Sequence, residues 1–80
     1  MQHVHWEDPV KIAFMRGVVR KIDGPSEALR CLADLWPDQR GPNYVSARML
    51  CRAALAGRRS AEEARMAFMT ATREAHLNVN

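Results

Sequence analysis

The sequence predicts a small α+β domain: an N-terminal antiparallel β-hairpin, or a small sheet, followed by three α-helices packed on one side, in the order β-β-α-α-α. Two observations favour this fold. Apolar residues alternate with a period of two near the start, and afterwards they recur at three-and-four spacing. With 80 residues we expect a single domain over residues 1–80, with residues 1–8 and 78–80 frayed.

The β-hairpin is predicted from the first quarter of the chain. Apolar residues at every second position from Val10 to Phe14 are typical of a half-buried strand. Gly17 can supply the positive φ that a tight hairpin turn requires. We therefore expect strands at about 9–15 and 17–23. An isolated hairpin is marginal in water, so it must lie on the helices, pair with a second molecule, or gain a third strand from residues 3–6.

The first helix is predicted between two prolines. Ser26, after Gly24-Pro25, can cap the first turn, and Pro37 prevents the helix from continuing past Trp36. Five residues form one apolar stripe: Ala28, Leu29, Leu32, Leu35 and Trp36. We expect a buried Trp36 whose indole N–H is hydrogen-bonded near the corner.

Two further helices follow this corner. One is predicted to begin near Pro42 or Asn43 and to end at Gly57. The next begins with a capping box from Ser60 to Glu63 and is expected to run to about Leu77. Each helix has one core stripe: Tyr44, Ala47, Leu50, Cys51 and Ala54 on the first, and Ala64, Ala67, Phe68, Ala71 and Ala75 on the second.

Composition narrows the classes of function. No long apolar run or secretion signal is present, so we expect a cytoplasmic protein. Cys31 and Cys51 fall on apolar helix stripes, where buried thiols are expected rather than a disulfide or a zinc site. His3, His5 and His76 lie near the two ends, and His3-x-His5 is at most half of a metal site.

Catalysis is not expected. Ser26 and Ser60 are accounted for as helix caps, and Glu62 and Glu63 by the positive end of a helix. No nucleophile remains beside a base, and no acid–base pair stands at a defined spacing. We therefore predict a non-enzymatic domain with no cofactor, no catalytic, cofactor-binding or metal-binding residues, no small-molecule substrate and no membrane contact.

Arginines give one candidate binding surface. The net charge is +3, and no acidic residue lies between Gln39 and Ala61. Five arginines in that interval could contact phosphate groups: Arg40, Arg48, Arg52, Arg58 and Arg59. On a helical wheel Arg48, Arg52 and Arg59 project in similar directions, which predicts a basic stripe on the second helix and the following turn. A weak nucleic-acid-binding regulator is the alternative function.

Apolar residues outside the core stripes give the leading hypothesis, protein–protein interaction. They predict a second surface of methionine and arginine, residue types that suit interfaces. Its candidate residues are Val45, Met49, Arg65, Met66, Met69 and Arg73. The partner is expected to be a protein, and a second copy of the chain, forming a homodimer, is one such partner.

The whole chain resembles a known family. The resemblance rests on Trp6, Pro9-Val10, Ala28, Leu32, Trp36-Pro37, Gly41, Ala47, Cys51, Ala54-Leu55, Gly57, Ala64-Arg65, Phe68 and Ala71. This pattern is similar to that of short alphaproteobacterial proteins grouped as domain of unknown function 982. The resemblance implies a stand-alone bacterial domain, and it implies no activity, cofactor or catalytic residue.

Overall fold

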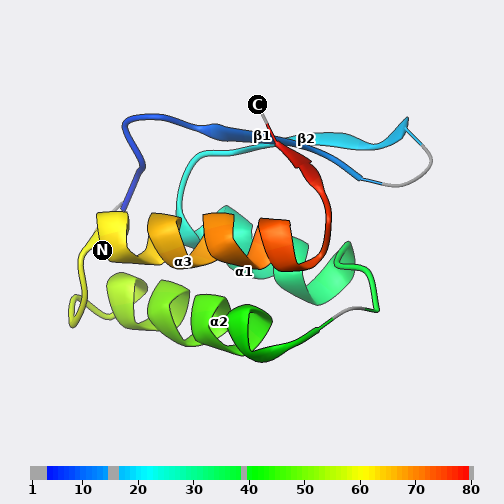
Figure 1. Cartoon of the computed structure of the whole chain (residues 1–80). Helices are drawn as coiled ribbons and strands as arrows, with labels where there is room; N and C mark the ends of the chain where they lie inside the picture. The colour runs from blue at the N-terminus through cyan, green and yellow to red at the C-terminus, as the bar shows by residue number, and fades with distance from the viewer. Residues whose placement is uncertain (1–3, 15–16, 39, 80) are drawn as a thin grey trace.

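The computed structural model describes residues 4–14, 17–38 and 40–79. Its elements are β1 (Val10–Ala13), β2 (Val19–Ile22), α1 (Pro25–Asp34), α2 (Pro42–Leu55), α3 (Ala61–Glu74) and β3 (Asn78–Val79). The predicted α+β class and the β-β-α-α-α order are confirmed (Figure 1). The short strand β3 is the one addition to that order.

The sheet is antiparallel, with the strand order β2-β1-β3. Gly17 closes the hairpin with φ 75°, as predicted, and the Phe14 N–H donates to the Val18 carbonyl oxygen at 2.6 Å. The third strand comes from residues 78–79, for which we expected fraying, and not from the N-terminal segment. Residues 4–6 are not a strand, and residue 3 lies outside the described part of the chain.

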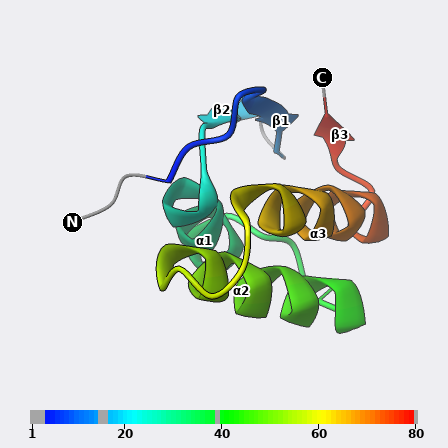
Figure 2. The same cartoon turned by 90° about the vertical axis from the view of Figure 1, so that its left-hand side faces the viewer.

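Three layers build the domain. The sheet covers α1 and α3, and α2 lies on the far side of these two helices (Figures 1 and 2). In β1 the buried Val10 and Ile12 alternate with the exposed Lys11, which gives the sheet an apolar inner side. Ile22 of β2 and Phe14, which directly follows β1, are buried on the same side. Consequently α2 is the helix whose outer side has no neighbouring layer.

Aromatic rings fill the centre. Phe68 of α3 lies between two tryptophans, with ring centroids 5.7 Å from Trp6 and 5.6 Å from Trp36. Trp6 also anchors the N-terminal segment, for which we expected fraying. Its backbone N–H donates to the Asp23 carbonyl oxygen at 2.6 Å, and its indole N–H donates to the Ala61 carbonyl oxygen at 2.9 Å.

Helix ends depart from the predictions where tertiary contacts intervene. Gly24 is the N-cap of α1 and Pro25 its first residue, so the prediction that Ser26 caps this helix is wrong. A Cβ on Gly24 would collide with the Val4 carbonyl oxygen, so the close approach of the N-terminal segment requires glycine there. The last helix ends at Glu74 rather than Leu77, because His76 takes a left-handed φ of 57°.

The corner between α1 and α2 is closed by side chains. Trp36 is buried at 4% exposure as predicted, but its Nε1 has no hydrogen-bond partner among the described residues, where the predicted bond is therefore not found. Tyr44 donates its hydroxyl to the Leu32 carbonyl oxygen at 2.9 Å. Arg40 donates to the carbonyl oxygens of Trp36 and Pro37. These residues therefore hold the corner together.

Candidate protein-interaction surface

Helix α2 is apolar on two opposite sides. Its core stripe consists of Tyr44, Ala47, Cys51 and Ala54, all of them buried. Roughly opposite, at about 100° per residue, lies a second set that we call the outer stripe: Val45, Met49, Ala53 and Ala56. Val45 is 51% exposed and Met49 66% exposed. A surface helix normally carries polar residues on this side, so the outer stripe calls for an explanation.

The outer stripe borders a groove of about 460 Å³. Its lining residues, which we call the α2 groove, are Ser46, Met49, Leu50, Ala53, Arg58 and Arg59. The first four occupy positions i, i+3, i+4 and i+7 of α2 and form its floor. Gly57, in a left-handed conformation with φ 78°, ends the helix as predicted, and the turn after it carries the two arginines to the end of the groove.

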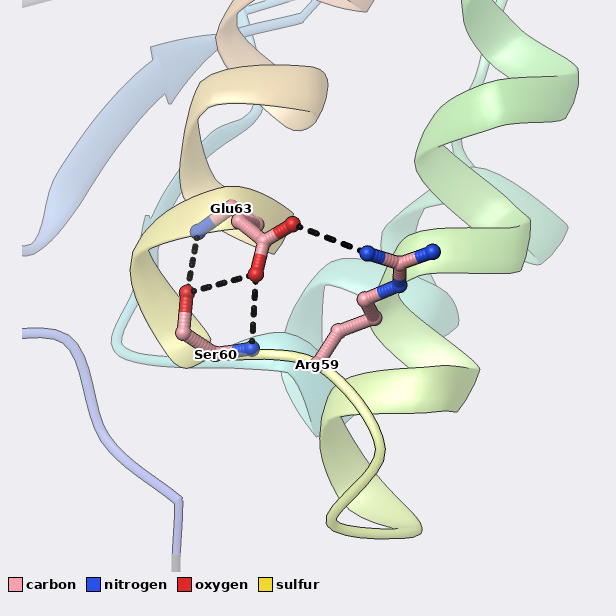
Figure 3. Close-up of polar contacts among 3 residues, drawn as sticks. All are labelled: Arg59, Ser60 and Glu63. Atoms are coloured by element: carbon pink, nitrogen blue, oxygen red, sulfur yellow. Dashed lines mark hydrogen bonds and ion pairs between the residues drawn. The ribbon is translucent and has the colours of Figure 1, made fainter.

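The start of α3 fixes one of these arginines. Ser60 and Glu63 form the predicted capping box: the Glu63 N–H donates to Ser60 Oγ at 3.0 Å, and the Ser60 N–H donates to Glu63 Oε1 at 3.2 Å (Figure 3). The Arg59 guanidinium lies 3.6 Å from the other oxygen of the same carboxylate (Figure 3). Both side chains of this ion pair are exposed, so its net contribution is small.

The predicted arginine stripe is divided by the structure. The guanidinium groups of Arg40 and Arg48 lie over the Tyr44 ring, at 5.2 and 5.8 Å from its centroid. Because α2 ends at Leu55, Arg59 is beyond the helix and does not share a helical face with Arg48. Arg52 and Arg58, in contrast, form no hydrogen bond, ion pair or ring contact with the described residues. These two cations are free to meet a partner.

The predicted methionine and arginine surface is also divided. Arg65 donates from Nε to the Asp8 carbonyl oxygen at 3.0 Å, and Met69 packs against the core. Met66, at 69% exposure, and Arg73 remain at the surface of α3. On α2 the side chains of Val45 and Met49 are exposed to solvent. Of the six predicted residues only Met49 lines the α2 groove.

Reactive thiols, metal sites and membrane-spanning helices have little support in the described residues. Cys31 and Cys51 are buried free thiols, as predicted. Burial raises the pKa of Cys51 to about 12, and it also raises the pKa of Cys31. No group of three or more His, Cys, Asp or Glu side chains in the described part could hold a metal ion, and His3 lies outside it. In the same part the longest helices have 14 residues, too few and too polar to cross a bilayer.

Two features of the surface escaped the sequence analysis. Ser46, Leu50 and Ala53 were not recognised as groove residues, because the groove depends on where the turn after α2 places Arg58 and Arg59. A second interval without acidic residues runs from Pro9 to Ile22 and includes the facing pair Lys11 and Lys21. Counting charges along the sequence would have revealed it. This lysine pair lies in the sheet, on the opposite side of the domain from α2 (Figure 2).

Fold and surface together define a small α+β domain with exposed apolar side chains along α2. The chain belongs to the family described as "Protein of unknown function (DUF982)", which matches residues 8–79. The NMR structure of Agrobacterium tumefaciens protein Atu1219 is similar, with 41% sequence identity, a TM-score of 0.77, and coverage of 91% of this chain and 73% of that chain. The comparison with curated proteins gave no match. The family resemblance predicted from the sequence is therefore confirmed.

Proposed function

We propose that this domain is a non-enzymatic protein-interaction module and that the α2 groove is its binding surface. The observation that carries the proposal is Met49, which is 66% exposed and lines the groove. Methionine adapts its shape to a partner, and complete burial of such a side chain contributes about 1.5–3 kcal/mol. The proposal includes a cytoplasmic location, in keeping with two buried free thiols. It involves no cofactor, small-molecule substrate or membrane.

The test is affinity capture from the native cell with nuclease treatment, comparing the natural chain with Met49→Glu. We expect the natural chain to retain proteins that the variant loses, because a carboxylate in the apolar floor opposes burial. Val19→Glu is the matched control, since Val19 is 52% exposed but belongs to the sheet edge. Retention of the same proteins by all three chains would contradict the proposal.

Self-association is one form of the same proposal. If the partner is a second copy, sedimentation at increasing concentration should show a dimer for the natural chain and a monomer for Met49→Glu. A strict monomer at high concentration would exclude this form and leave a different protein as the partner. In both cases folding of the variant is checked by circular dichroism.

Nucleic-acid binding is the second candidate, supported by Arg52 and Arg58, which have no partner among the described residues. Two phosphate contacts predict that log affinity falls with log salt concentration at a slope of about −2. Filter binding of duplex and single-stranded DNA and RNA at low salt tests this, with Arg58→Glu as the variant. No retention at low salt would exclude this function.

A further inference from the structure

We infer that the α2 groove receives an amphipathic helix of another protein, and that the charged flank of this helix is acidic. The inference rests on the proposed function, because it assigns a chemistry to the partner of the same surface. It has two independent supports, the shape of the groove floor and the charge around it.

The shape of the floor favours a helix as the ligand. Its residues span eight positions of α2, from Ser46 to Ala53, and the seven steps between them cover about 10 Å at 1.5 Å per residue. Ser46 and Ala53, at the two ends, are small and allow a second helix axis to approach closely, while Met49 and Leu50 form a ridge between them. Ridges at this spacing fit the grooves of another helix. Apolar anchors at i, i+3, i+4 and i+7 on the ligand would therefore match the floor.

The charge around the floor favours carboxylates on the ligand. Arg58, at the end of the groove, has no partner among the described residues. Arg52 follows Met49 by three positions on the exposed side of α2 and is equally unpaired. Glu63 is the acidic group beside the groove, and it is bonded to Ser60 and Arg59. An acidic flank would pair with the two free arginines, whereas a basic flank would be repelled.

A second copy fits this surface less well. Pairing α2 with α2 about a twofold axis would bring the outer stripes together, but α2 has no acidic residue to pair with Arg52 or Arg58 of the other copy. The outer side of α3 carries Met66 beside Glu62, but docking it into α2 of another copy joins two different surfaces. Such a contact forms a closed dimer only if each copy uses both of its surfaces; otherwise copies add on in an open chain. We therefore commit to a different protein as the source of the helix.

The experiment uses two fluorescein-labelled designed helices of about 18 residues, long enough for five turns. Both have leucines at the spacing that matches the floor, and they differ only in having Glu or Lys on the flanks. Fluorescence anisotropy measures their binding to the natural chain and to Met49→Glu, Arg58→Glu and Lys21→Glu. The Lys21 variant has the same change of charge on the opposite side of the domain.

We expect the Glu-flanked helix to bind more tightly than the Lys-flanked helix. Met49→Glu and Arg58→Glu should each weaken its binding by about tenfold or more, because an unpaired or like charge at a contact costs more than about 1.4 kcal/mol. Lys21→Glu should leave it unchanged within about twofold. Arg58→Glu should also improve binding of the Lys-flanked helix, which a merely damaged fold would not do.

Two other results would overturn the inference, with different consequences for the proposed function. Equal binding of both helices, still lost in Met49→Glu, would refute the acidic partner and retain the interaction surface. If neither helix binds, the acidic-helix assignment fails. Sedimentation and the affinity capture then decide the proposed function: a dimer or captured proteins lost in Met49→Glu would retain it with another occupant, and the absence of both would remove its support from this groove.

Discussion

Helix α2 is capped by a side chain from the end of α3. Its own N-cap residue, Gly41, has no side chain, so the first backbone N–H groups need another acceptor. Glu74 supplies it: Oε2 accepts from the Asn43 N–H at 3.1 Å and Oε1 from the Tyr44 N–H at 3.0 Å. The negative charge also lies at the positive end of the α2 dipole.

Replacing Glu74 with alanine removes both bonds. Loss of an N-cap acceptor costs about 0.5–2 kcal/mol, and a hydrogen bond to a charged group contributes about 1.5–3 kcal/mol. Because Glu74 is only partly buried, we expect a loss of about 2 kcal/mol of unfolding free energy for Glu74→Ala. For a domain of this size that corresponds to a fall in Tm of about 10 °C. Glu74→Gln, which keeps one acceptor, should lose about half as much.

Gly41 makes the test specific. A Cβ at this position would lie 2.5 Å from Glu74 Oε2, so an alanine must displace the carboxylate. The Gly41 φ of −87° is accessible to alanine, so backbone strain is not the cause. Gly41→Ala should therefore cost about 1–2 kcal/mol in the natural chain, and only a few tenths once Glu74 is alanine.

Urea unfolding of the four chains, followed by tryptophan fluorescence and circular dichroism, measures this double-mutant cycle. Glu7→Ala, at an exposed carboxylate with no hydrogen bond or ion pair to the described residues, is the control and should change little. Equal costs of Gly41→Ala with and without Glu74 would refute the reasoning, since the two positions would then act independently.

Three further predictions concern stability and reactivity. Trp6→Phe should destabilise the domain by about 1–3 kcal/mol more than Trp36→Phe, because among the described residues the Trp6 indole has a hydrogen-bond partner and the Trp36 indole has none; equal losses in urea would contradict this. Ser60→Ala should cost about 1 kcal/mol and Ser26→Ala almost nothing, since only Ser60 caps a helix, as thermal unfolding will show. With its pKa raised to about 12, the Cys51 thiol stays protonated at neutral pH and should not react with Ellman's reagent until denaturant is added, so rapid native labelling would contradict its burial.

Features determined by neighbouring residues were predictable from the sequence. The capping box from Ser60 to Glu63 joins groups three residues apart, and Gly17 and Gly57 each terminate an element through their own φ. The period-two and period-3.6 patterns correctly predicted the hairpin and the three helices, because one side of each element is buried in a single core. These patterns express local preferences that the tertiary structure did not override.

Features determined by distant residues were not predictable in the same way. The cap of α2 joins Asn43 to a carboxylate 31 positions away, and only the packing of α3 on α2 brings the two together. The strand β3 has two residues, too few for a period-two pattern. Ser26 lost its predicted role because the N-terminal segment packs on Gly24, which places the start of α1 earlier. Binding residues were predicted least well, since the groove depends on a turn as well as a helix.

The outer stripe of α2 and its arginines are best understood together. An apolar helix face without a covering layer would promote self-association, and cations beside it oppose that association through like-charge repulsion while attracting an acidic partner. Neutralising Arg52 and Arg58 with alanine should therefore have two opposite effects. Binding of the Glu-flanked helix should weaken. At high concentration the variant should also show a larger sedimentation coefficient than the natural chain, because it self-associates. If binding weakens but the chain stays monomeric, the arginines select the partner without protecting the stripe, and the role in preventing self-association is refuted.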